Sequence, residues 1–278
     1  MFNTVLFGLL SAIAWGIGDF NGGLAARKLS ARLVVLFSQV AGVLALIFLV
    51  WLLGERAMSL RDVGLSMVAG VIGAAGLLLL YGIFAAGDVS VAASITGVVA
   101  TLVPVAYGMY WDGLPHVVVI LGFGLALVGV GVISLPSRAK PLPMRTLLLS
   151  LLCGICFGGF LILIAQLHSH AVFLPLVWAR VASISLLLAL VVSQRQWAVP
   201  GGRVWWPLIG CGVMDALGNA FFVMAKQIGR LDVASALSSL YPASTVILAF
   251  IFLRERVSRM QTIGIVITLA AIPLISYH

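Results

Sequence analysis

The chain has 278 residues, of which 63% are hydrophobic and 9% are charged, and its formal net charge is +8. A soluble domain would need long polar segments, and none is present. The Lys and Arg residues lie in short segments between apolar runs. That pattern is typical of membrane topology and not of a phosphate-binding surface, so the bilayer is an expected partner and nucleic acid is not.

The apolar runs are about 20 residues long, which is the length an α-helix needs to cross the hydrocarbon core. We therefore expect an all-α, multi-pass protein of the cell (inner) membrane with ten transmembrane helices. The first run follows no basic segment and precedes no cleavage site, so it is interpreted as a retained span. In chain order the spans are expected at about 3–25, 33–53, 63–86, 90–110, 116–136, 145–167, 173–193, 204–227, 232–253 and 259–276.

An offset of 142 residues places the chain on itself without a gap, with matches in nearly every apolar run. Such even spacing indicates an internal repeat. Because each copy holds five spans, the second copy must enter the bilayer upside down, giving two inverted five-helix repeats. We expect a first repeat at 1–137, a linker at 138–143 and a second, inverted repeat at 144–278. Matched pairs include Gly70 with Gly212, Gly122 with Gly264, and Ile133 with Ile275.

Positive charge is distributed unequally between the connections on the two sides of the membrane. Eleven Lys and Arg residues fall on one side, in the connections after expected spans 1, 5, 7 and 9. The other side has Arg56, Arg61 and Arg230, with Lys226 near a helix end. The positive-inside rule predicts that the richer side is cytoplasmic, which places both termini outside.

Ionisable residues inside apolar spans are costly, so each is a candidate functional residue. Asp215 lies near the middle of the eighth span, and Asn219 follows it on the same face. We expect Asp215 to bind a cation or a proton, and Arg180 to bind a substrate carboxylate or to neutralise Asp215. Asp19 is a second coupling candidate. A structural ion pair of Asp215 with Arg180 or Lys226 is the alternative, and Lys226 can also extend to the interface.

Prolines interrupt two matching spans. Pro242 leaves the carbonyl of Ser238 without its helical partner, and Pro104 does the same to the carbonyl of Ala100. Paired interruptions point to the substrate site in repeat transporters, whereas structural kinks are the alternative. The residues expected to orient the substrate or to line its cavity are Asn219, Ser238, Tyr241, Trp15 and Tyr81.

Motifs for other functions are not found. Cys153-x-x-Cys156 has no second Cys or His pair, so it is interpreted as helix packing, and neither a metal nor a cofactor is expected. His168 and His170 are interpreted as solvated loop residues. The chain lacks an ATP-binding loop, a Gly-x-Ser-x-Gly motif and a His-Glu-x-x-His motif. We therefore expect neither a primary pump nor an enzyme.

One segment resembles a known family. Ala-Ser-Ala-Leu-Ser-Ser-Leu-Tyr-Pro at 234–242, followed by Leu-Arg-Glu-Arg-Val-Ser at 253–258, is similar to the second copy of the EamA family of the drug/metabolite transporter superfamily. Arg254 replaces the usual Gly of the turn, while Glu255 and Arg256 match. The first copy has Trp111-Asp112-Gly113 at that turn and no Tyr-Pro in its fourth span.

This resemblance implies ten spans around a central cavity lined by spans 1, 3, 4, 6, 8 and 9, with alternating access. It also implies cytoplasmic termini, opposite to the loop charges. We expect a secondary transporter of a small polar metabolite, with an amino acid or amine exporter as the leading interpretation and proton coupling left open. The alternative is an uncoupled facilitator or exchanger, or a multidrug efflux carrier. A monomer and a homodimer both remain open.

Overall fold

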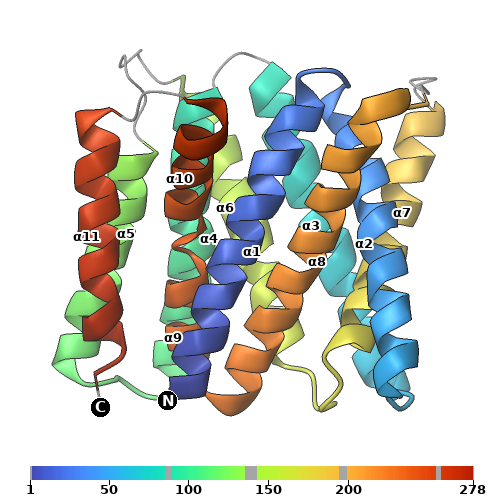
Figure 1. Cartoon of the computed structure of the whole chain (residues 1–278). Coiled ribbons are helices and arrows are strands. Elements are labelled where there is room, and N and C mark those ends of the chain that lie inside the picture. The colour runs from blue at the N-terminus through green and yellow to red at the C-terminus, as the bar shows by residue number, and fades with distance from the viewer. Residues whose placement is uncertain (1, 86–88, 135–142, 194–198, 255–257, 278) are drawn as a thin grey trace.

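The computed structural model describes all residues except 1, 86–88, 135–142, 194–198, 255–257 and 278, and it leaves the side chains of 81, 82, 84–85 and 89–94 undescribed. The described chain is helical throughout its spans (Figure 1). Its elements are α1 (Phe2–Ala26), α2 (Ala31–Leu53), α3 (Leu60–Ala85), α4 (Val89–Trp111), α5 (Val117–Ile133), α6 (Met144–Ala165), α7 (Phe173–Ser193), the 3-10 turn η1 (Gly202–Val204), α8 (Trp205–Ile228), α9 (Leu231–Ser238), α10 (Tyr241–Leu253) and α11 (Arg259–Ile275).

These helices make ten spans, because α9 and α10 together form one interrupted span, Leu231–Leu253. Within the described residues, seven spans are long and apolar enough to cross a membrane. Three shorter apolar helices, Ile95–Trp111, Val117–Ile133 and Arg259–Ile275, complete the set. The predicted ten-span, all-α membrane fold is confirmed, and the helix ends differ from the expected bounds by only a few residues.

The second repeat is inverted with respect to the first. The start of α1 and the end of α11 lie at the same edge of the molecule, which we call the terminus side, and the end of α5 and the start of α6 lie at the opposite edge, the linker side (Figure 1). Helix α1 therefore runs away from the terminus side, whereas α6 runs toward it. The expected linker at 138–143 lies outside the described residues apart from Pro143, so the repeat bounds stay a prediction.

A close contact between α5 and α11 occurs twice, at residues that are related by the 142-residue offset of the sequence repeat. A Cβ placed on Gly122 would lie 2.8 Å from the nitrogen of Ile275, and a Cβ placed on Gly264 would lie 2.7 Å from the nitrogen of Ile133. The two contacts exchange under the 142-residue offset and join α5 to α11. Small residues let helix backbones approach in this way when hydrocarbon offers no hydrophobic driving force between helices. The packing thus carries the same two-fold relation as the sequence.

The two expected proline interruptions turn out differently. Helix α9 ends at Ser238, and α10 begins at Tyr241 with Pro242 in its first turn, where a missing N–H needs no partner. Pro104, in contrast, lies inside the continuous helix α4. In the first repeat the proline therefore leaves the helix continuous, and the link between the paired prolines and the substrate site stays a prediction. Only the second repeat has a divided helix in the part of the chain that the structure describes.

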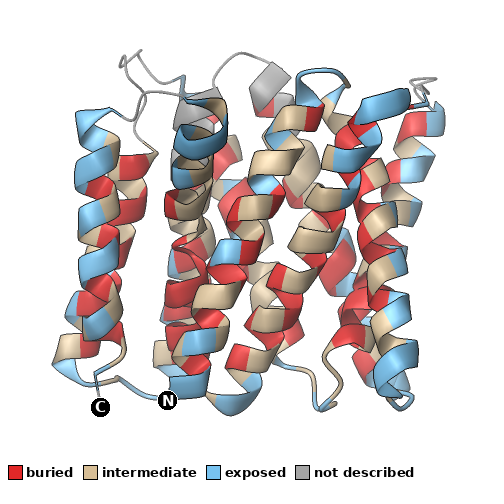
Figure 2. Ribbon diagram, in the orientation of Figure 1, coloured by how far each residue is buried: buried red, intermediate tan, exposed pale blue. Residues whose placement is uncertain are grey.

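Residues are buried where helices contact each other and exposed on the outer faces of the helices (Figure 2). Small and aliphatic side chains are buried between helices, as in the cluster that joins α7 and α8 around Leu176 and Phe222. Large apolar side chains such as Phe48, Trp51 and Leu52 point outward, with exposed fractions of 56%, 76% and 57%. An apolar exterior of this kind suits lipid, and it would be an aggregation hazard in water. The site must therefore be sought among polar residues that the helices enclose.

Candidate functional site

An ion pair joins α7 and α8 within the spans. The guanidinium of Arg180 donates to the carboxylate of Asp215, and the side chains are 15% and 40% exposed. The Asn219 amide donates to the Asp215 backbone carbonyl at 2.7 Å and faces its carboxylate at 3.4 Å. Of the two cations considered for Asp215, Arg180 is thus its partner and Lys226 is not. The Asp215 side chain thus keeps exposed surface within a span, beside Arg180.

A buried polar contact supports Arg180 from the α2 side. The Ser183 hydroxyl donates to the side-chain oxygen of Gln39, and it also lies 3.1 Å from the backbone carbonyl of Arg180. Gln39 is 4% exposed and Ser183 is 5% exposed. A polar pair this deep must be satisfied internally. Sequence reasoning did not assign Gln39, although an amide in an apolar span is the signal that could have identified it.

Asp19 brings a second carboxylate to the same place. Its neighbour Gly18 packs on α8, where a Cβ on Gly18 would lie 3.3 Å from the Asp215 nitrogen. The Asp19 side chain is exposed and lies within electrostatic reach of both Asp215 and Tyr241. It has no hydrogen-bond or ion-pair partner among the described residues. The polar cluster of Asp19, Arg180, Asp215 and Asn219 therefore holds two carboxylates for one guanidinium.

Three aromatic side chains lie on the terminus side of the polar cluster. Trp15 stacks on Phe222 with ring centroids 6.2 Å apart and an interplanar angle of 25°, and it meets Tyr241 edge-on at 6.2 Å and 84°. Trp15 precedes Asp19 by one turn of α1, and Phe222 follows Asp215 by two turns of α8. We call these three side chains the aromatic layer, which lies next to the polar cluster on its terminus side.

The divided helix carries polar groups of its own. Ser235 and Ser238 in α9 are 2% and 0% exposed, and their hydroxyls have no hydrogen-bond partner among the described residues. The Tyr241 hydroxyl reaches α4, since a Cβ on Gly97 would lie 3.8 Å from its oxygen. The structure thus brings Asp215, Asn219, Arg180 and Asp19 together and places Trp15 and Tyr241 beside them. Ser238 lies in α9 without a described polar contact to the cluster, and the Tyr81 side chain lies outside the described residues.

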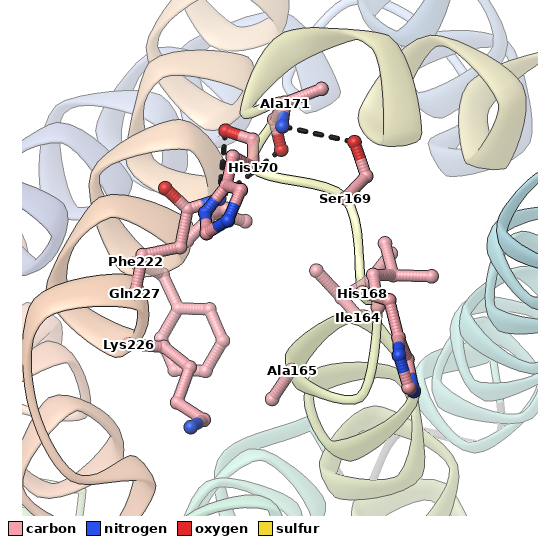
Figure 3. A pocket seen from close by; sticks show the side chains of 11 residues that line it. Ile164, Ala165, His168, Ser169, His170, Ala171, Phe222, Lys226 and Gln227 are labelled. Carbon is pink, nitrogen blue, oxygen red and sulfur yellow. Dashed lines mark hydrogen bonds between the residues drawn. The ribbon is translucent and has the colours of Figure 1, made fainter. Parts of the chain in front are cut away.

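A cavity of about 180 Å³ lies on the terminus side, between the end of α6 and the end of α8. We call it the vestibule. In Figure 3, Lys226 and Phe222 on α8 lie on the opposite side of the hollow from His168 and Ile164. The connection 167–171 covers it and is tied to α8, because the Gln227 amide donates to the carbonyls of residues 170 and 171 at 3.2 Å. The interpretation of both histidines as solvated loop residues missed this cavity.

Two carboxylates of the α2–α3 hairpin hold the same connection from outside. Glu55 accepts the backbone amides of 172–174 at 2.7–3.1 Å and so caps the N-terminus of α7. Asp62 accepts the amides of 168 and 169 at 3.3 and 3.1 Å, and it is 3% exposed. Negative charge at these amides complements the positive end of the helix dipole. Sequence reasoning did not assign either residue.

The cysteines pack between helices. The Cys153 thiol lies 3.1 Å from the carbonyl of Gly76, which joins α6 to α3, and all three cysteines are free. Among the described residues, no three His, Cys, Asp or Glu side chains are grouped so that they could hold a metal ion.

The comparisons with known proteins agree with this architecture. The model of the EamA-like transporter family matches residues 144–277. A protein solved by crystallography shares the fold with a TM-score of 0.81 over 98% of each chain, at 14% identity. An uncharacterized protein of Methanocaldococcus jannaschii is 28% identical over 101 residues, which are 36% of this chain and 74% of that protein, so that relative is about half as long.

These matches identify a multi-pass membrane protein. The matched family is a family of secondary transporters of metabolites or drugs, and it is not an enzyme family. The solved structure supports the fold over the full length, and the family match supports the assignment over the second repeat. Residues 144–277, which make up the second repeat, belong to the EamA-like transporter family.

Proposed function

We propose that this chain exports an amino acid or a related amine by alternating access, with coupling to protons through Asp215 and Asp19. The observation that carries the proposal is the charge of the polar cluster, in which two carboxylates face one guanidinium. The unpaired carboxylate suits an ammonium group or a proton. The Arg180 guanidinium suits a carboxylate, which it can bind through two parallel hydrogen bonds.

The Arg180–Asp215 ion pair offers a simple coupling step. A substrate carboxylate that binds Arg180 takes the place of the Asp215 carboxylate. Asp215 then lies unpaired among apolar helices, where its charge is costly and a proton is favoured. Binding of the substrate and binding of a proton are thus linked through one side chain. Asn219 contacts Asp215 and Tyr241 contacts Trp15, and we expect these side chains to orient the bound molecule.

Accessibility and loop charge support export. Asp19 and Asp215 retain exposed surface, while the aromatic layer lies on their terminus side. The described residues of the charge-rich set, including Arg27, Arg145 and Arg259, lie at the linker side. By the positive-inside rule this side is cytoplasmic, so the cluster faces the compartment from which an exporter loads. Labelling of Arg27→Cys in a cysteine-free chain, in intact cells with an impermeant thiol reagent, tests this: protection supports the orientation, and ready labelling reverses it.

The central test is transport in proteoliposomes by the Asp215→Asn variant. Asparagine keeps the size and an acceptor for Arg180 but cannot take the proton. We expect accumulation driven by a pH gradient to be lost, with exchange of unlabelled for labelled substrate retained. Asp112→Asn, at an exposed connection, is the matched control and should transport normally. Unchanged uptake with unchanged pH dependence would remove Asp215 from the mechanism, and wild-type flux that ignores an imposed pH gradient would favour the uncoupled carrier.

The cargo class is tested by thermal stabilisation of the purified protein with amino acids, amines and nucleobases. A ligand at one hundred times its Kd stabilises the folded state by about 2.7 kcal/mol. We expect the shifts to concentrate on amino acids and amines. A flat response to both classes, with a response to nucleobases, would reject the proposed cargo.

A further inference from the structure

We propose that the vestibule is a second binding site, specific for small carboxylates, with Lys226 as its charged ligand. The proposal that the vestibule binds an anion is argued from the cavity and the residues that line it. The proposal that the transported substrate also binds there rests on the proposed function. In that case the vestibule would select amino acids over the corresponding amines.

The vestibule lies on the same face of α8 as the polar cluster, but it is a separate site. Asp215, Asn219, Phe222 and Lys226 follow one face of α8 at helical spacing. Eleven residues separate Asp215 from Lys226, or about 16 Å along the helix axis. Phe222 lines the vestibule and also stacks on Trp15. The aromatic layer therefore separates two polar sites on the same helix face, one on each side of it.

The charge of the vestibule is positive. Lys226 is partly buried, and it makes no hydrogen bond or ion pair with any residue that the structure describes. The imidazoles of His168 and His170 also line the cavity, whereas the described lining has no carboxylate. The nearby carboxylates, Glu55 and Asp62, are occupied by backbone amides. An ammonium group partly removed from water without a counter-ion favours binding of an anion.

The size and chemistry of the cavity indicate which anion. Pockets for drug-sized ligands have about 300–1,000 Å³, so a cavity of about 180 Å³ suits a much smaller molecule. The Lys226 ammonium acts as a point charge, and Ile164 and Phe222 provide apolar walls for a short side chain. Gln227 is already engaged with the covering connection. One cation beside an apolar wall matches a monocarboxylate better than a multiply charged phosphate.

The test measures thermal stabilisation of the purified full chain, in chloride-free buffer, by propionate, propylamine and inorganic phosphate. We expect propionate to stabilise the wild type, Lys226→Arg and Lys28→Gln, the last being an exposed linker-side control. Lys226→Gln should weaken propionate binding at least tenfold, and propylamine binding should not depend on Lys226. Propionate binding that survives Lys226→Gln would overturn the proposed site. A Lys226-dependent response that is stronger to phosphate than to propionate would also overturn it, because the ligand would then be a phosphate or a lipid headgroup.

Two further variants keep the outcomes separate. Ala165→Leu narrows the vestibule from α6 while leaving Lys226 in place, so it should also abolish the propionate response; retention of the full response overturns the site. Arg180→Gln removes the guanidinium of the polar cluster and should leave the Lys226-dependent response intact. Loss of that response in Arg180→Gln would assign propionate to the polar cluster instead. Failure of the Asp215→Asn transport test would refute the coupling mechanism without affecting this binding result.

Discussion

Replacing Arg230 with Gln removes the cation that faces Asp232, a carboxylate with no exposed surface in the first turn of α9. Arg230 binds this carboxylate through Nε at 3.1 and 3.3 Å and through Nη2 at 2.7 Å. The same guanidinium donates to the carbonyl of Asp112 at 2.9 Å and to that of Gly113, so it ties α9 to the α4–α5 connection. The hydrogen bond to Asp232 is the main cause that raises the pKa of Arg230, which stays charged at any pH of interest.

The magnitude follows from what remains after the substitution. Breaking a buried pair by removing one partner costs about 3–5 kcal/mol, because the other charge is left uncompensated. The Arg230 side chain is 29% exposed, so water reaches part of the site and we expect about 2–3 kcal/mol. Asp232→Asn leaves only the charge of Arg230, which is partly exposed to water, and should cost about 1–2 kcal/mol. The double variant should be less destabilised than Arg230→Gln alone.

The assay is thermal unfolding in detergent, followed by far-UV circular dichroism. For a chain of this size about 1 kcal/mol corresponds to roughly 2–4 °C, so Arg230→Gln should lower Tm by about 5–10 °C. Because a raised folded pKa adds stability that is lost only as pH rises through it, the deficit should be constant from neutral pH to mildly alkaline pH. Arg61→Gln is the control, since that side chain is 57% exposed and 3.8 Å from Asp62. An Arg230→Gln deficit no larger than that of Asp232→Asn, or of Arg61→Gln, would refute the reasoning.

Three further substitutions test the packing and the helix ends. Glu55→Gln should cost about 1–2 kcal/mol and speed hydrogen exchange at amides 172–174, because the charged cap of α7 is lost; unchanged exchange would deny the cap. Gly212→Ala should strongly reduce the folded yield, because its Cβ would overlap the carbonyl of Ser38, whereas Gly23→Ala meets open space and should fold normally in the same membrane-extraction assay. Arg254→Gly should raise Tm in a thermal melt by an amount equivalent to about 1 kcal/mol, because Arg254 is a non-glycine residue in the left-handed region, with φ of 54°. A lowered Tm would show that the Arg254 side chain compensates for that conformation.

The spans could be predicted from the sequence because each depends on its own apolar run. The prolines show where local reasoning ends. Pro104 and Pro242 remove the same hydrogen bond, yet α4 continues through Pro104 and the other span divides. A Cβ on Gly158 would lie 3.1 Å from the Pro104 ring, so α6 packs directly against this turn of α4. The serine-rich run before Pro242 instead gives the backbone local alternatives to the helix, as the Ser239 hydroxyl shows at 2.7 Å from the carbonyl of Ala236.

The charged residues of the candidate site could be predicted for a similar reason, since Asp19, Arg180 and Asp215 each stand out against apolar neighbours. The partner of Asp215 stayed open between Arg180 and Lys226, because that choice depends on how α7 and α8 pack against each other. The caps formed by Glu55 and Asp62 had no local signal. Their partners are backbone amides more than 100 residues away in sequence, and a hairpin carboxylate that binds a distant connection looks the same in sequence as one that faces water.

The reciprocal contact of Gly122 with Ile275 and of Gly264 with Ile133 is isologous, meaning that each partner presents the same surface to the other. An isologous contact needs no covalent link between its halves. A chain of half this length, such as the Methanocaldococcus jannaschii relative, has room for one five-helix unit. Two separate copies of such a unit can form the α5–α11 contact only when they are inserted in opposite orientations. Fusion of the two halves removes that requirement of dual insertion, and it leaves each half free to change its polar residues independently of the other.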